Sequence, residues 1–338
     1  MSAVDTKTSQ AAKDSKAVIA AAEAAVGDMR KVRDETAKVI FGQESVIERS
    51  LVTLLSGGHG LLMGLPGLAK TKLVETLGIV LGIQSARIQF TPDLMPSDIL
   101  GSEILQQDED GRRSFQFVKG PVFTQLLMAD EINRASPRTQ AALLQSMQEY
   151  HVTIAGHRYD LPAPFHVLAT QNPLEQEGTY PLPEAQLDRF LMQIDVHYPD
   201  LDAERRILLE TTGASEASAA AVLSGKRLQE LQALVRRIPV GESVVNAILE
   251  LVRSARPGAD DGEMNRFISW GPGPRASQAL MLTTRARALL DGRLSPSVDD
   301  VLALAEPVLQ HRMQLSFAAR AEKVSVRDVI ADIKSRIG

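Results

Sequence analysis

The stretch GLPGLAKT, residues 64–71, decides the fold. It follows a short apolar run, HGLLM (59–63), and precedes a helical pattern over 70–82. It departs from the phosphate-binding pattern G-x-x-x-x-G-K-[ST] only at Ala69, where the pattern has glycine. Between a strand and a helix, the backbone N–H groups of such a loop point into one concavity, and the helix adds its positive end. The sequence therefore predicts a nucleotide site in which Lys70 reaches the β- and γ-phosphates and the Thr71 hydroxyl ligates Mg²⁺.

Ala69 is compatible with this interpretation. Glycine is required where φ must be positive or where no Cβ fits. Because the residue before the lysine begins the helix, we expect alanine to be accepted if its methyl group faces away from the ligand. The alternative is an ordinary turn that contains Lys-Thr by chance.

A second motif, QLLMADEIN (125–133), is an apolar strand that ends in two acids, Asp130 and Glu131. Two charges at the end of a buried strand cost free energy unless they meet a cation or take part in chemistry. We expect Asp130 to hold Mg²⁺ through water and Glu131 to act as general base on the attacking water. The alternative is a strand exit with solvated acids.

Two further motifs extend this predicted site. Asn172 lies in LATQNP, where it would orient the water or contact the γ-phosphate, although Asn-Pro is also an ordinary turn. Arg189 lies in LPEAQLDRFLM, just before an apolar run. It would either form a salt bridge within the chain or act on the γ-phosphate of a neighbouring subunit.

The apolar runs predict an α/β domain. Five of them, each short enough for a strand, alternate with helical patterns at 59–63, 86–90, 124–129, 165–170 and 191–196. Such runs suit a parallel sheet covered by helices. One of those helices, 137–149, has a cap in Ser136 and proline at its first position. Residues 1–16 read as a disordered leader and 17–40 as a helix, so the first domain covers 17–200.

The pattern after residue 200 is almost entirely helical. Residues 201–338 therefore read as a helical domain, with a flexible loop expected at 213–221 and helices near 202–212, 226–237, 242–254, 275–290, 297–312 and 325–336.

Composition limits the remaining classes of protein. The 338 residues carry a net charge of −5 and no cysteine, which excludes disulfides and thiolate metal sites and fits a reducing cytoplasm. No apolar run is long enough to span a bilayer, and no signal sequence is visible. The six histidines show no metal-motif spacing. The acidic balance makes a nucleic-acid partner unlikely.

With these motifs assembled, the chain resembles the MoxR family of AAA+ ATPases over about residues 38–315. The resemblance rests on IFGQ (40–43), GLPGLAKT, LLMADEINRASPRTQAALLQSMQE (126–149), ATQNP, YPLPEAQLDRFLM (180–192) and WGPGPRASQAL (270–280). The alanine before the lysine is similar to that family's own loop. The resemblance implies a P-loop αβα core with a five-stranded parallel sheet, a small helical lid, and hexameric rings with ATP between subunits.

The resemblance also implies roles for single residues. Ile40, Gly42 and Gln43 would lie near the adenine; Walker A would comprise Gly64, Pro66, Gly67, Leu68, Ala69, Lys70, Thr71 and Lys72; and Walker B would comprise Asp130 and Glu131. Asn172 would be sensor 1, Arg189 the arginine finger and Arg275 sensor 2. Arg134 competes with Arg189 for the finger role. Arg275 would act within its own subunit or across the interface, or else only join lid to core.

Two segments are similar to loops of the same clade. Residues 91–120 resemble a helix-2 insert whose hydrophilic tip, QQDEDGRR, suits a hairpin turn, and residues 149–164 resemble a hairpin placed before sensor 1. In a ring these loops would face the pore or a client.

The resemblance favours a motor that uses ATP and Mg²⁺ to remodel or activate another protein. Relatives are thought to work with proteins that carry a von Willebrand factor A domain, often in metal or cofactor insertion. One alternative is a nucleotide-gated oligomeric binding module with little turnover. Others are a chelatase motor subunit and a helicase-like motor, the last disfavoured by an acidic insert tip and 4% aromatic residues.

Overall fold

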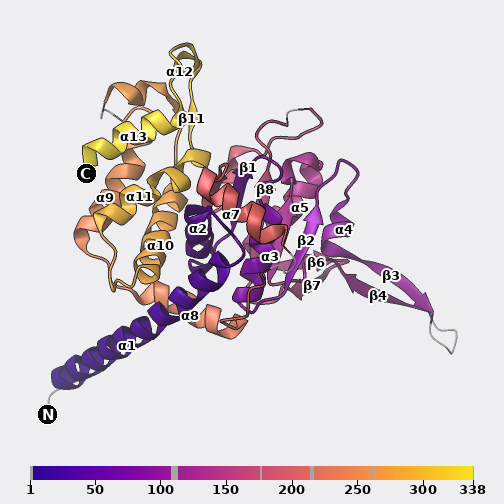
Figure 1. Cartoon of the computed structure of the whole chain (residues 1–338), viewed down its shortest axis with the longest axis horizontal. Helices are drawn as coiled ribbons and strands as arrows, with labels where there is room; N and C mark the ends of the chain where they lie inside the picture. Colours follow the sequence, from indigo (N-terminus) through magenta and orange to yellow (C-terminus); the bar gives the residue numbers. More distant parts are fainter. Residues whose placement is uncertain (1–2, 108–112, 176, 214–216, 260–261, 338) are drawn as a thin grey trace. The chain divides into compact units, whose positions relative to one another are not determined.

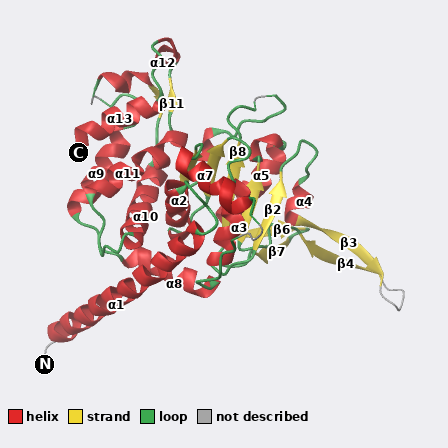
Figure 2. Cartoon of the chain, viewed as in Figure 1, coloured by secondary structure: helices red, strands yellow, loops and turns green. Residues whose placement is uncertain are grey.

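The computed structural model describes residues 3–107, 113–175, 177–213, 217–259 and 262–337, with side chains from residue 20 onward (Figure 1). The chain forms two compact units. One contains residues 35–50 and 57–225 and holds the main sheet, whereas the other contains 1–34, 51–56 and 226–338 and is mostly helical (Figure 2). The sequence predicted a boundary at residue 200. The structure instead keeps 201–225 with the sheet and groups most of the N-terminal helix with the helical unit.

The sheet has five strands in the order β2-β5-β8-β1-β9, and every neighbouring pair is parallel. The strands are β1 (Gly60–Gly64), β2 (Ser85–Gln89), β5 (Leu126–Asp130), β8 (His166–Gln171) and β9 (Met192–Val196). All five residues of β5 are buried, as expected of a strand covered on both faces. The predicted α/β class and five-stranded parallel sheet are confirmed.

Two helices carry the predicted sequence signals. Helix α3 (Lys70–Val80) directly follows the loop after β1 and contacts β2 and β5. Helix α5 (Pro137–Glu149) begins as predicted, because the Ser136 hydroxyl accepts a hydrogen bond from the Thr139 backbone N–H at 3.3 Å. Such a cap stabilises a helix by about 1 kcal/mol.

Two antiparallel hairpins extend the sheet-containing unit. After α4 (Pro96–Leu100), β3 (Gly101–Gln107) pairs with β4 (Arg113–Lys119), and Figure 1 shows this hairpin projecting away from the sheet. Of the predicted tip, 106–113, residues 108–112 lie outside the described residues, while Gln106 and Gln107 end β3 and Arg113 begins β4. The second hairpin pairs β6 (His151–Ile154) with β7 (His157–Asp160). The hairpins touch each other, since the rings of Phe117 and Tyr159 stack at 4.1 Å.

Short helices complete this unit. They are η1 (Ile132–Arg134), α6 (Glu184–Leu187) and α7 (Leu201–Thr211). Residue 213 and residues 217–221, in the predicted flexible loop, form no helix or strand, and 214–216 lie outside the described part. Helix α2 (Glu44–Leu55) begins in this unit and ends in the other.

The helical unit has its own core. Helices α9 (Glu242–Ser254), α10 (Pro274–Leu290), α11 (Val298–Leu309) and α13 (Val326–Ile337) pack on one another, accompanied by α8 (Gly225–Arg237), η2 (Glu263–Phe267), η3 (Gln310–Arg312) and α12 (Phe317–Ala321). The sequence missed a small sheet here, in which β10 (Ile268–Trp270) pairs with β11 (Gln314–Leu315). These strands are too short to show an alternating pattern.

The expected disordered leader is wrong for most of its length. Helix α1 runs from Ala3 to Ala37, so residues 3–16 are helical. This segment, AVDTKTSQAAKDSK, contains no glycine or proline, and its alanine, lysine and glutamine residues favour a helix that continues from the stronger pattern behind it. Among the described residues, no helix combines the length and the apolar character that crossing a bilayer requires.

Candidate functional site

The loop 64–69 turns from β1 into α3 through two residues in the left-handed region. Gly67 has a φ of 82°, and Ala69, the N-cap of α3, has φ 55° and ψ 22°. From the sequence, Ala69 was expected at the helix start without a positive φ; it does precede α3, but its φ is positive. The general pattern has glycine at this position because the backbone there is left-handed, which costs a residue with a Cβ about 1 kcal/mol.

The Lys70 side chain folds back and donates hydrogen bonds to its own loop. Its Nζ donates to the carbonyl oxygens of Gly64 and of Leu65, the latter at 3.0 Å. Burial lowers the pKa of Lys70, and the charges of Asp130, Glu131 and Glu175 act in the opposite direction. The ammonium group is therefore partly desolvated, and the charges of three carboxylates favour its protonated form.

Asp130, the last residue of β5, has both carboxylate oxygens occupied. Its Oδ1 accepts from the Thr170 hydroxyl at 2.5 Å, and its Oδ2 accepts from Arg87, from Nη2 at 2.6 Å and from Nε at 3.2 Å. Asp130 as a whole is 8% exposed. A buried carboxylate needs such partners, because an unpaired one would be strongly destabilising.

Glu131 follows in a left-handed conformation with a φ of 54°. Its Oε2 accepts from Gln89 Nε2 at 2.7 Å and from Arg134 Nη1 at 2.9 Å, and its backbone N–H donates to the Thr170 hydroxyl at 2.9 Å. A non-glycine residue in this region is strained, and such strain is frequent in active sites. Arg134, which the sequence suggested as a rival finger residue, is thus bonded to Glu131 of its own chain.

Asn172 lies where the sequence placed it, directly after β8. It is buried, its Oδ1 accepts from the Leu174 N–H at 3.1 Å, and it lines a cavity together with Asn133 and Glu175. Parallel strands bring their carboxyl ends to one edge of the sheet, so Asn172 and the acids after β5 share this edge.

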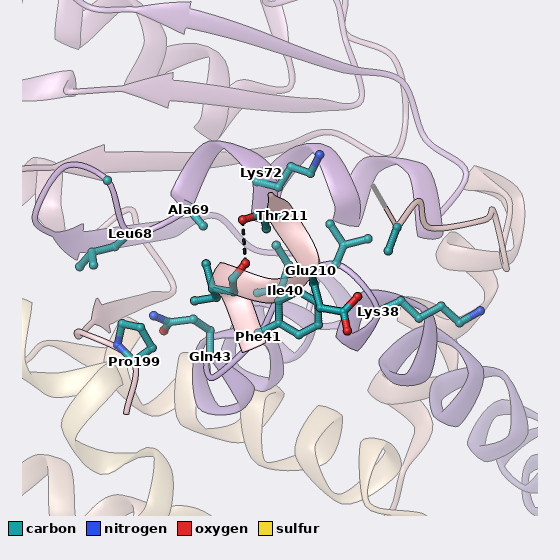
Figure 3. A pocket seen from close by; sticks show the side chains of 14 residues that line it. Lys38, Ile40, Phe41, Gln43, Leu68, Ala69, Lys72, Pro199, Glu210 and Thr211 are labelled. Carbon is teal, nitrogen blue, oxygen red and sulfur yellow. Dashed lines mark hydrogen bonds between the residues drawn. The ribbon is translucent and has the colours of Figure 1, made fainter. Parts of the chain in front are cut away.

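A second, apolar cavity adjoins the loop (Figure 3). Three segments of the sheet-containing unit line it: residues 38–43, the loop with Lys72, and the chain from Pro199 through α7. Of the residues predicted to bind nucleotide, Ile40, Gln43, Gly67, Leu68, Ala69 and Lys72 line this cavity. An apolar cavity beside a phosphate loop matches the needs of an adenine ring.

Gly42 and Gln43 fasten the first of these segments to the start of α7. A Cβ on Gly42, whose φ is 66°, would lie 2.3 Å from the Ala203 Cβ, so only glycine fits. Gln43 Nε2 donates to the His197 carbonyl at 2.9 Å, and the Arg206 guanidinium lies 4.7 Å from the centre of the Phe41 ring.

The two remaining predicted arginines lie elsewhere in the chain. Arg189 follows α6 and is half-buried, and its backbone N–H donates to the Gln186 carbonyl at 3.1 Å. Arg275 lies in the first turn of α10, in the helical unit. Their roles as finger and sensor stay predictions.

The donor set near the loop fits magnesium rather than a softer metal. It consists of the Thr71 hydroxyl and the Asp130 carboxylate, both oxygen ligands of the kind that Mg²⁺ prefers alongside phosphate oxygens. Within the described ranges, no group of three or more His, Cys, Asp or Glu side chains could hold a metal without a nucleotide.

Several site residues escaped the sequence analysis. Arg87 and Gln89 contact the two acids, and Phe41, Pro199, Ile207, Glu210 and Thr211 line the apolar cavity. Arg87 and Gln89 left a signal, because they alternate with apolar residues in the predicted strand ARIQF. The residues of α7 left none, since a helix beyond the last strand gives no sign that it folds back to the loop.

Comparison with known proteins agrees with this geometry. The family described as "ATPase family associated with various cellular activities (AAA)" matches residues 59–192, and the AAA lid domain matches 264–333. Chaperone MoxR1 of Mycobacterium tuberculosis is 43% identical over 298 residues, which are 88% of this chain and 78% of that relative. The chain belongs to the MoxR family of AAA+ ATPases.

Other members support the same assignment. Protein MoxR of Paracoccus denitrificans is 32% identical over 87% of this chain and 91% of its own length. A solved structure from Cytophaga hutchinsonii, described as an ATPase, superposes with a TM-score of 0.87 at 38% identity, covering 96% of this chain and 98% of that one. This MoxR-family chain therefore has the AAA+ core and lid that its motifs predicted.

Proposed function

We propose that this MoxR-family protein hydrolyses Mg²⁺-ATP and uses the energy to remodel or activate other proteins. The observation that carries the proposal is the placement of Lys70, after β1, and of Asp130 and Glu131, at the end of β5, at one edge of the sheet, because both strands run parallel to β8. A cation for phosphate, a carboxylate for the metal and a carboxylate for water are the parts that phosphoryl transfer to water needs.

Each part has a proposed role. Lys70 and the loop N–H groups hold the β- and γ-phosphates, while the apolar cavity holds the adenine. Thr71 and Asp130 hold Mg²⁺, whose charge, when it is bound, offsets the charge on the phosphates. Glu131 takes the proton of the attacking water, and Asn172 orients that water.

Residues beyond this edge complete the proposed reaction. Arg189 of a neighbouring subunit stabilises the charge of the transition state, as arginine fingers do, and Arg275 is proposed as sensor 2. This requires an oligomer, which we propose to be a hexameric ring.

The proposed clients are proteins, with those that carry a von Willebrand factor A domain as first candidates, and the proposed work is maturation or metal insertion. We propose that such a client contacts the two hairpins, which touch each other through the stacked rings of Phe117 and Tyr159. The cytoplasmic location stays a prediction.

The test is steady-state ATPase activity measured against protein concentration, with Glu131→Gln as control. We expect specific activity to rise with concentration, because a neighbour completes the site. Glu131→Gln should lower turnover about a hundred- to ten-thousand-fold and leave ATP binding intact. Equal turnover by wild type and variant at every concentration would contradict hydrolysis at this site, and tight ATP binding without turnover would favour the nucleotide-gated module.

A further inference from the structure

Arg87 holds a position that the family motifs do not explain. It lies on β2, the edge strand of the sheet, and the register of β2 against β5 sets Gln89 opposite Asp130. Side chains two residues apart share a face of a strand, so Arg87 and Gln89 lie on the same face as Asp130. The strand thus delivers a guanidinium group to the carboxylate that is proposed to hold Mg²⁺.

Arg87 and Asp130 form an ion pair in which the arginine is far more exposed than the aspartate. Both Nη2 and Nε of Arg87 donate to the same oxygen, Oδ2, while Thr170 holds Oδ1. The Asp130 side chain is 12% exposed and that of Arg87 is 48% exposed. The arginine is therefore the partner with access to solvent, whereas the aspartate side chain is largely buried.

We propose that Arg87 acts as the counter-ion of Asp130 while no metal is bound. Arg87 must release the Oδ2 atom of Asp130 before the site takes up its divalent cation. This proposal rests on the proposed Mg²⁺-ATP function and assigns to Arg87 the task of setting how much metal that function needs.

Charge and geometry explain why release is required. A guanidinium group bonded to Oδ2 and a divalent cation held by the same carboxylate would repel each other across a few ångströms. Thr170 holds Oδ1 of Asp130 both before and after Arg87 leaves, so the carboxylate keeps its orientation while the partner of Oδ2 changes. Gln89 Oε1 already accepts from Arg87 Nη2 at 2.9 Å, which gives the released guanidinium an anchor.

Removing the charge of Arg87 should raise the affinity of the site for a divalent cation, not lower it. Replacing Arg87 by methionine keeps an unbranched apolar stem, although a shorter one, and removes the competing charge, so the site should bind a divalent cation more tightly. A half-exposed ion pair is weak, and we expect the concentration for half-saturation to fall about three- to tenfold. A residue that merely supported the fold would weaken binding when removed.

The experiment measures Mn²⁺ binding by electron paramagnetic resonance with the full-length protein saturated with ADP, so that no turnover is needed. Arg87→Met should lower the half-saturating Mn²⁺ concentration. Arg87→Lys keeps the positive charge but loses the paired Nε and Nη2 donors, so its half-saturating concentration should lie between those of the wild type and Arg87→Met. Arg87→Gln provides the same test if the methionine variant does not fold.

The matched control is Arg327→Met in the helical unit. Arg327 Nε lies 3.0 Å from Glu306 Oε1, and its side chain is 51% exposed, close to the value for Arg87. This control should leave Mn²⁺ binding unchanged. Unchanged or weaker Mn²⁺ binding by the Arg87 variants, with ADP bound normally, would overturn the role of Arg87. Failure of the wild type to bind ADP at all would instead overturn the proposed function.

Discussion

The two ends of the central sheet hold polar groups in opposite ways. His59 and His166 lie at the amino ends of β1 and β8, and both are buried and hydrogen-bonded to backbone groups. The Val167 N–H donates to Nδ1 of His59 at 2.9 Å, so the proton of this ring is on Nε2, which lies 3.1 Å from the Met147 carbonyl. His166 Nδ1 lies 2.8 Å from the Gly58 carbonyl.

At the carboxyl ends the groups are charged and their partners are exchangeable. Asp130 and Glu131 are bonded to Arg87 and Arg134, whose side chains are 48% and 42% exposed. In the part of the chain that the structure describes, Lys70 Nζ donates to the carbonyl oxygens of Gly64 and Leu65, and a phosphate oxygen can replace these acceptors. This difference predicts that the histidines at the amino ends contribute mainly to stability, whereas the charged groups at the carboxyl ends contribute mainly to ligand binding.

The largest expected effect is a loss of stability in acid, caused by the two buried histidines at the amino ends of the strands. Burial lowers the pKa of His59 to about 3, helped by the nearby His166, and burial lowers the pKa of His166 to about 4. The unfolded chain takes up these protons near pH 6.5. Stability is therefore complete above pH 6.5 and falls as the pH drops, until the folded pKa values are reached. The expected slope is about 1.4 kcal/mol per pH unit for each histidine.

Urea unfolding followed by circular dichroism between pH 4.5 and 8 measures that slope. His166→Asn keeps a donor at the position of Nδ1 and removes the titrating group, so it should reduce the slope by the share of one histidine. The control is the exposed His157→Asn, which should leave the slope unchanged. Equal slopes for wild type and His166→Asn would show that other groups govern the acid transition.

A substitution at the carboxyl ends of the strands should lower ligand affinity and leave stability nearly unchanged. Lys70→Met removes the cation that faces the phosphates, and we expect ATP affinity to fall about thirtyfold or more, since a buried charged contact is worth about 2 kcal/mol or more. The free energy of unfolding without nucleotide should change by less than about 1 kcal/mol, because the loss of two hydrogen bonds is offset by the removal of a charge that burial desolvates.

Isothermal titration calorimetry with ATP and urea unfolding of the same samples give both quantities. The exposed Lys226→Met serves as control and should change neither. A Lys70→Met protein that binds ATP as the wild type does would remove Lys70 from the site. One that loses several kcal/mol of stability would show that the contrast between the two ends does not hold.

The sequence predicted the parts of the site that local motifs encode. Lys70, Asp130, Glu131 and Asn172 follow apolar strands, and parallel strands bring such positions to one edge. It did not predict Arg87 as the partner of Asp130, because pairing of β2 with β5 is a property of the sheet order, which no local pattern gives. The contribution of α7 to the apolar cavity, and the two small strands β10 and β11, likewise depend on contacts between distant segments.

Ala69 and Glu131 show the same limit at the level of the backbone. Their left-handed conformations are set by the turns from β1 into α3 and from β5 into η1. Because alanine and glutamate occupy this region rarely, nothing in their identity predicts it. The structure alone shows that the charged end of the sheet also holds strained backbone.

The smallest expected effect tests whether that strain is part of the site. Ala69→Gly should raise the free energy of unfolding by up to about 1 kcal/mol, because glycine adopts the left-handed region without cost. ATP affinity should change less than about threefold, since the loop N–H groups keep their direction.

Ala155→Gly is the matched control, with a φ of 49° in the turn between β6 and β7, away from the loop. Equal stabilisation of both variants, measured by urea unfolding, would mean that the strain at Ala69 is local. A large fall in ATP affinity for Ala69→Gly alone would mean that the alanine holds the loop in its binding shape.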